Sequence, residues 1–171
     1  MSQRHWTLIP LAVVATGAQA TEYFSADQVL QVIFPGAKLT PAPITLSDEQ
    51  IQHVEQMSGV KVPYKDLKAW KVTGGGWLLI DQVIGKHELI TYAVGLNANG
   101  SVKQVEIMDY RETYGYAIRT PAWRHQFVGK TSASKVTLNQ DIVNISGATL
   151  SSQHVTEGVK RLLATYAVAL K

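Results

Sequence analysis

A run of small and hydroxyl-bearing residues near the end of the chain has the composition of an anion-binding site. Residues 144–152 lead into the longest stretch with helical periodicity. The start of a helix presents backbone N–H groups without intrahelical partners, at the positive end of the helix dipole. Gly147 allows close approach of the backbone, and the segment as a whole suits a phosphate group. Its hydroxyl groups belong to Ser146, Thr149, Ser151 and Ser152. Because Ser and Thr are also common helix caps, plain capping remains an alternative role.

Other chemistries find little support in the sequence. The 171 residues include no cysteine, which excludes disulfides, thiolate metal sites and cysteine nucleophiles. Four histidines lack the spacing of metal ligands and are expected to be structural or on the surface, so no metal site is expected: His53, His87, His125 and His154. The 16 basic residues exceed the 13 acidic ones only slightly and form no block. No nucleic-acid partner is therefore expected.

Helices are expected at both ends of the folded part. A short helix follows the capping residue Ser25 and ends at Pro35-Gly36. A second lies between Ser47 and Gly59, where Ser47 and Gln50 have the spacing of a capping box. A long helix is expected over about residues 150–170, because its apolar residues form one stripe.

Three short strands are expected between these helices, at residues 77–84, 89–96 and 102–108. The pair Asn99-Gly100 favours a tight hairpin between the second and third. In the third strand Lys103, Gln104 and Glu106 are expected to face water, which is typical of an antiparallel sheet with one solvated face. The sequence therefore predicts an α+β fold, an antiparallel sheet flanked by N-terminal helices and a long C-terminal helix.

The segment between the third strand and the long helix is less regular. Residues 109–130 are expected to form a functional loop followed by a short helix at residues 123–128. Residues 132–138 are expected to form one further strand.

The first twenty residues have the pattern of a secretory signal. Arg4 and His5 supply a positive start, residues 7–17 are apolar, and Ala18-Gln19-Ala20 is typical of a cleavage site. The apolar run is shorter than the ~20 residues needed to span a bilayer. We therefore expect cleavage after Ala20 and export, most simply to a bacterial periplasm, with an uncleaved anchor as the alternative. Residues 21–171 are expected to form a single domain.

The segment Ser146-Gly147-Ala148-Thr149, followed by Leu150-Ser151-Ser152, resembles the flavinylation motif of FMN-binding domains. The resemblance extends to Tyr92–Gly95, to Glu112-Thr113-Tyr114-Gly115 and to Trp123–Lys130, and covers about residues 69–171. This family includes the flavin-carrying subunits of sodium-pumping quinone reductases and Rnf-type complexes, and small free-standing periplasmic proteins.

The resemblance implies a covalent FMN on Thr149. In the family, a separate FAD-dependent flavin transferase joins FMN to the last threonine of the motif through a phosphoester bond. The neighbouring motif residues are then expected around the cofactor: Ser146, Gly147, Ala148, Leu150 and Ser151. One position departs from the family pattern, since Val143 stands where an aspartate is usual, and Asp141 is the nearest carboxylate before it.

For the flavin ring, the resemblance points to the loop that begins at residue 110. Tyr114, Tyr116 and Trp123 are candidates to stack on the ring, and Gly115 would let the backbone come close. Ordinary hydrophobic packing is the alternative for each aromatic. Charges near the ring change its potential, and the candidates are Arg111, Glu112, Arg119 and Lys130. Glu112 is favoured because it opens the matched Glu-Thr-Tyr-Gly stretch, and a solvated surface role is the alternative.

The function implied is that of an exported electron carrier that relays electrons between membrane or periplasmic redox proteins. The sequence holds no dinucleotide motif, so electrons are expected from another protein, and no catalytic residue is assigned. Two alternatives remain, a flavin-dependent reductase of a small molecule and an accessory binding domain without flavin.

Overall fold

The computed structural model describes residues 24–171, so the expected signal segment and its cleavage site lie outside the described residues. The helices are α1 (Ala26–Ile33), α2 (Asp48–Ser58), α3 (Pro121–Arg124) and α4 (Thr149–Thr165), with 3-10 turns η1 (Tyr116–Arg119) and η2 (His125–Phe127) and a π-helical turn η3 (Tyr166–Leu170). The strands are β1 (Leu39–Pro41), β2 (Ile44–Thr45), β3 (Asp66–Val72), β4 (Trp77–Ile84), β5 (Leu89–Leu96) and β6 (Val102–Asp109). No helix among these residues is both long and apolar enough to cross a membrane.

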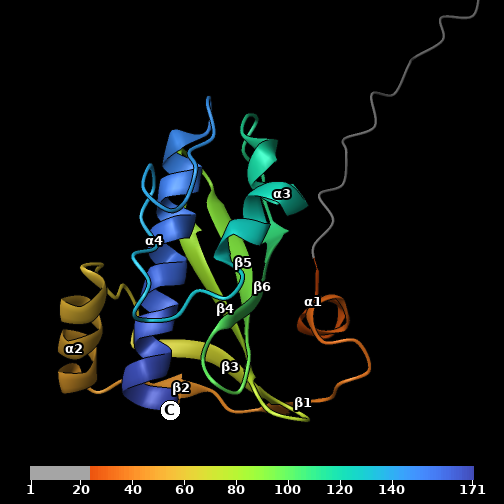
Figure 1. Cartoon of the computed structure of the whole chain (residues 1–171), viewed down its shortest axis with the longest axis vertical. Coiled ribbons are helices and arrows are strands. Elements are labelled where there is room, and N and C mark those ends of the chain that lie inside the picture. The colour runs from red at the N-terminus through yellow and green to blue at the C-terminus, as the bar shows by residue number, and fades with distance from the viewer. Residues whose placement is uncertain (1–23) are drawn as a thin grey trace, which may run out of the picture.

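One antiparallel sheet organises the chain, with strand order β1-β3-β4-β5-β6 and β2 also paired with β3. Helix α4 covers one face of the sheet and α1 the other, while α2 packs on the outside of α4 (Figure 1). The prediction of an α+β fold with an antiparallel sheet and a long C-terminal helix is confirmed.

Local sequence signals account for the expected elements. Both N-terminal helices begin with a complete capping box, formed by Ser25 with Gln28 and by Ser47 with Gln50. Gly59 ends α2 in a left-handed conformation, as glycine readily does. Strands β4 and β5 have the expected bounds, and β6 extends one residue further.

The prediction that one face of the sheet is solvated is wrong. Glu106 is buried, and its carboxylate is paired with the guanidinium of Arg124, which comes from α3. Apolar residues of α1 and of the sheet fill a second core on this face, because the sheet is covered on both sides. Lys103 stays exposed because it lies at a β-bulge. Leu96 pairs with Val102 and Gly95 with Gln104, so Lys103 has no partner on β5. This extra residue explains why apolar and polar residues do not alternate strictly along β6.

The prediction of a strand at residues 132–138 is also wrong. The segment is irregular, and Leu138 forms an isolated bridge to Ile142. Val136 has a φ of 42°, which a strand does not allow. The N–H groups of Val136 and Thr137 bond to the carboxylate of Asp141, at 3.1 and 2.7 Å, instead of to a neighbouring strand.

Two further differences concern β3 and the segment after β6. Strand β3, together with the short β1 and β2, extends the expected three strands to six. The helix expected at residues 123–128 is present as α3 and η2, which begin two residues earlier because Thr120 caps them and Pro121 occupies the first position.

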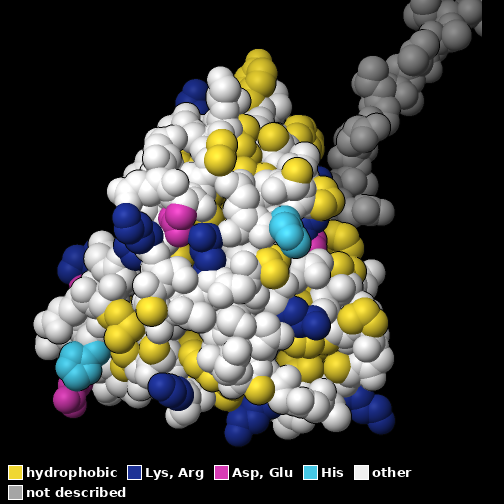
Figure 2. All heavy atoms as spheres, in the orientation of Figure 1, with side chains coloured by type: hydrophobic (Ala, Val, Ile, Leu, Met, Phe, Trp, Pro, Cys, Tyr) yellow, Lys and Arg dark blue, Asp and Glu magenta, His cyan; other side chains and the backbone are white. Residues whose placement is uncertain are grey.

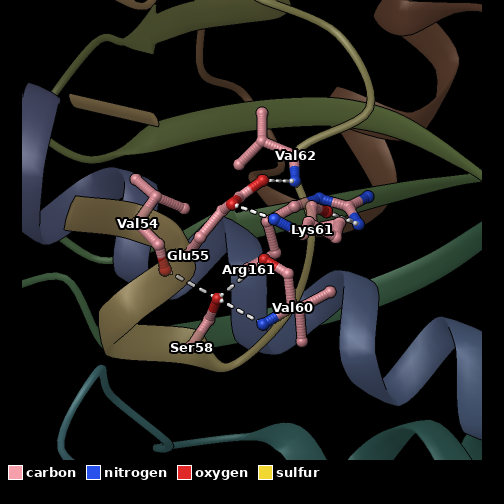
Figure 3. A network of polar contacts seen from close by, with 7 residues as sticks. All are labelled: Val54, Glu55, Ser58, Val60, Lys61, Val62 and Arg161. Atoms are coloured by element: carbon pink, nitrogen blue, oxygen red, sulfur yellow. Dashed lines mark hydrogen bonds and ion pairs between the residues drawn. The ribbon is translucent and has the colours of Figure 1, made fainter. Parts of the chain in front are cut away.

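The larger core lies between the sheet and α4 and contains a buried ionic network. The carboxylate of Asp81 accepts hydrogen bonds from the Tyr92 hydroxyl (2.9 Å) and from the Arg161 guanidinium (2.6 Å). Arg161 also donates to the carbonyl of Lys61 at 3.3 Å, next to the contacts by which Glu55 and Ser58 hold the segment after α2 (Figure 3). This network connects α4, β4, β5 and the end of α2.

Candidate functional site

A pocket of about 380 Å³ lies where three segments meet at one end of α4. The turn between β4 and β5 forms one wall, the loop after β6 forms another, and the start of α4 forms the third (Figure 1). The lining residues are Lys86, His87, Glu112, Thr113, Tyr114, Gly147, Ala148, Thr149, Leu150 and Ser151. Two of the three segments carry the residues that the flavin resemblance implies.

The start of α4 is not capped by a side chain. Ala148 occupies the position before the helix and provides no hydrogen bond to it. The Ser152 hydroxyl donates to carbonyls of the same turn, and Ser151 lies beside Tyr110, so neither of these hydroxyls caps the helix. Within residues 24–171 no acceptor bonds the N–H groups of Thr149, Leu150 and Ser151. The first turn therefore keeps the donors that favour an anion.

Thr149 is the exposed first residue of this helix. Its hydroxyl oxygen lies 3.3 Å from the side-chain amide nitrogen of Asn144. The amide oxygen of Asn144 accepts a 2.8 Å hydrogen bond from Ser152. The side chain of Asn144 therefore links Thr149 to Ser152, one turn further along the helix. Nothing in the sequence indicated this contact.

Close packing joins the loop after β6 to the start of α4. Gly115 has a φ of 93°, and a Cβ there would lie 2.5 Å from both the Ala148 side chain and the Tyr110 hydroxyl. Only glycine fits this position. The Tyr110 hydroxyl donates to the carbonyl of Tyr114 and lies 3.3 Å from the Ser151 hydroxyl. Burial raises the pKa of Tyr110, so it stays a neutral donor that ties the two walls together.

Glu112 fixes the wall that the turn between β4 and β5 forms. It is 7% exposed, and one of its carboxylate oxygens accepts hydrogen bonds from three consecutive backbone N–H groups, those of Lys86 (2.5 Å), His87 (2.6 Å) and Glu88 (3.1 Å). Burial acts to raise the pKa of Glu112, but these donors outweigh it and hold the pKa below its ordinary value. A Cβ on Gly85 would lie 2.5 Å from this oxygen, so the turn closes around an ionised carboxylate.

Residues 85–164 match the FMN-binding domain family. The match includes all three walls of the pocket and lies within the range of the sequence resemblance. No curated protein is significantly similar to the chain. The family match supports binding of a flavin by this part of the chain.

Most of the predicted site residues line the pocket, namely Glu112, Tyr114, Gly147, Ala148, Thr149, Leu150 and Ser151. Gly115 lies directly behind Ala148. Ser146 is exposed just before the helix and is not part of the lining. Tyr114 is 79% exposed, which leaves its ring free to cover a flat ligand.

Trp123 lies in the larger core, away from the pocket lining. It is 5% exposed, and its ring packs edge-on against Phe127 at 5.2 Å. Its indole N–H donates to the carbonyl of Val143 at 2.8 Å. In this structure Trp123 therefore supports the segment that leads to the motif, which is the packing role that the sequence left open.

Asp141 is engaged elsewhere in the domain. Besides the N–H groups of Val136 and Thr137, its carboxylate binds the ammonium of Lys130 at 2.8 Å. Burial acts to raise the pKa of Asp141, but these partners hold it below its ordinary value. Asp141 stabilises the left-handed turn at Val136, and among the described residues it is Asn144 that contacts the Thr149 side chain.

Lys86 and His87 also line the pocket, although nothing in the sequence indicated it. The turn that holds them was read only as a connection between strands, and His87 as one of several scattered histidines. Across the described residues no group of three or more His, Asp or Glu side chains has metal-site geometry.

Replacing Glu112 by glutamine tests the role of its charge. We expect Glu112→Gln to lower the free energy of unfolding by about 1.5–3 kcal/mol at pH 7, since hydrogen bonds to a charged acceptor are replaced by weaker ones. Because the folded pKa is depressed, this stabilisation is complete above the unfolded pKa of about 4.3 and is lost as the pH falls through the folded value. Urea unfolding of both proteins from pH 7 down to about pH 3 measures this.

The surface residue Glu157, bonded to the side chain of Gln153, provides the control. Glu157→Gln is expected to change stability less. A Glu112→Gln protein as stable as the parent at pH 7 would contradict the role of this carboxylate.

Proposed function

We propose that the protein is an exported flavoprotein electron carrier with FMN joined to Thr149 through a phosphoester bond. The observation that carries the proposal is the exposed Thr149 hydroxyl at an uncapped helix start that opens into a pocket. The bound group would supply electron transfer, while the chain would supply the attachment point and the surrounding walls. Export rests on the signal pattern in the first twenty residues.

The attachment step needs a flavin transferase and FAD. The hydroxyl oxygen of Thr149 forms a bond to the FMN phosphorus as the bond between FMN and AMP breaks. AMP leaves, and the hydroxyl proton passes to a base of the transferase. The resulting phosphodiester carries one negative charge beside the N–H groups of the first turn, where a helix dipole stabilises an anion by ~0.3–1 kcal/mol.

The remaining lining suits a flavin. The walls offer the exposed ring of Tyr114, the apolar side chain of Leu150 and the hydroxyl of Thr113. A pocket of this kind, mostly apolar with a few polar groups, is typical of small cofactor sites. The residues present therefore fit the group that the family match implies.

An apolar surface beside the pocket supports a carrier role. Tyr114 and Leu150 line the pocket and are exposed, and Tyr116 and Val143, on the segments next to them in the chain, are exposed as well. In Figure 2 hydrophobic side chains gather on the upper part of the molecule, and few charges lie among them. A small apolar patch suits brief docking of another redox protein.

Stopped-flow reduction of the flavinylated protein distinguishes a carrier from a reductase. We expect slow reduction by NADH, because the sequence holds no dinucleotide motif, and rapid reduction by membranes that contain the electron-transfer chain. Rapid direct oxidation of NADH would contradict the carrier and favour a reductase of a small molecule.

A further inference from the structure

The turn between β4 and β5 brings two basic side chains to the pocket. Lys86 and His87 are exposed and belong to its lining, opposite the start of α4. Neither belongs to the flavinylation motif or to the matched loop after β6. Because both side chains line the pocket, they can contact a molecule bound in it.

The turn is held from two sides. Glu112 binds its three successive N–H groups. On the other side, Nδ1 of His154 on α4 lies 2.7 Å from the carbonyl of Ile84 and donates to it. Gly85 donates to the carbonyl of Glu88 at 2.7 Å and closes the turn. Lys86 and His87 therefore extend from a fixed backbone.

The charge of Lys86 is not neutralised within the part of the chain that the structure describes. No ion pair or hydrogen bond holds its ammonium group there. Glu112, a buried carboxylate in the pocket lining, uses one oxygen on the backbone N–H groups of the turn. The pocket thus combines a fixed anion behind the turn with two basic groups on its surface.

We propose that Lys86 and His87 are the basic groups that contact the flavin ring and stabilise its reduced form. This inference rests on the proposed function, because it takes the phosphate to be tethered at Thr149, on the opposite wall. The ring then has the space between Thr149 and the β4–β5 turn. A bound flavin gains negative charge on reduction, so a nearby positive charge favours the reduced state.

Redox titration of the flavinylated protein tests this assignment. Lys86→Met and His87→Gln are made singly and together, and Lys86→Arg keeps the charge. We expect the double variant to hold about tenfold less reduced flavin at a given potential, a shift of about 30 mV for a two-electron couple. Lys86→Arg is expected to stay close to the parent protein.

Lys103 provides the matched control. It is an exposed lysine whose ammonium lies 5.3 Å from the centre of the Phe34 ring, on the α1 side of the sheet. Lys103→Met is expected to leave the potential unchanged. Intact mass and thermal unfolding of each variant confirm that flavin content and folding are equal.

The outcomes separate the two proposals. Unchanged potential in the double variant with full flavin content overturns the role of Lys86 and His87 and leaves the proposed function standing. An equal shift in Lys103→Met also overturns it, because the effect is then not local. A parent protein without attached flavin overturns the proposed function and this inference together.

Discussion

Thr149→Val is expected to yield a folded protein that carries no covalent flavin. Valine keeps the shape of the side chain and removes the oxygen that would bond to phosphorus. The Thr149 side chain is exposed, and within residues 24–171 it has one hydrogen bond, from Asn144 at 3.3 Å. Loss of such a side chain at a helix start costs ~0.5–2 kcal/mol at most. Intact mass measures the flavin, and thermal unfolding measures the fold.

Two matched variants accompany this change. Thr149→Ser keeps the hydroxyl and is expected to retain flavin. Ser146→Ala removes an exposed hydroxyl from the same segment and is expected to have no effect on attachment. Flavin still present in Thr149→Val would show that Ser151 or Ser152 is the acceptor.

Asp81→Ala is expected to destabilise the protein by about 3–5 kcal/mol. This change leaves the guanidinium of Arg161, 9% exposed, without its carboxylate partner. The fully buried Tyr92 loses the acceptor of its hydroxyl, and burial already raises its pKa, so it cannot supply a compensating charge. Urea unfolding of the two proteins gives the difference.

An exposed ion pair provides the comparison. Lys65→Ala breaks the contact between Lys65 and Asp48 at the surface and is expected to change little, because exposed pairs contribute little. The double variant Asp81→Leu with Arg161→Met removes both charges and is expected to recover part of the loss. A loss in Asp81→Ala no larger than that in Lys65→Ala would contradict a stabilising role for the buried network.

The sequence predicted best what local spacing determines. The helix caps at Ser25 and Ser47, the Asn99-Gly100 turn and the stripe of α4 depend on neighbours a few residues away, and the structure has them at those positions. In β3 the period of two holds only at Leu67 and Ala69, because Val72 lies three positions after Ala69 and packs in the core on the other face of the sheet, so this strand was not predicted.

What the sequence did not predict depends on contacts between distant segments. Glu106 reads as a surface residue until Arg124, 18 positions later, is packed against it. Residues 132–138 have strand-forming side chains, but the carboxylate of Asp141 takes their backbone donors.

In the candidate site, too, the local features were predicted and the contacts between distant segments were not. The motif at residues 146–149 is local and was predicted, and so was the helix that follows it. The place of Lys86 and His87 depends on Glu112, about 25 positions later, and no spacing within the turn reveals it. Glu112 was predicted as a site residue because it opens the stretch that resembles the FMN-binding family. Its hydrogen bonds to the β4–β5 turn could be seen only in the folded structure.

The most direct test of a flavin on Thr149 is a peptide map of the protein purified from cells that express a flavin transferase. Trypsin is expected to cleave after Lys135 and after Lys160 and so to release residues 136–160 as one peptide. If FMN is attached to Thr149, this peptide gains the mass of one FMN less one water, and its fragment ions place the group on Thr149. An unmodified peptide, or a flavin on Ser151 or Ser152, would contradict it.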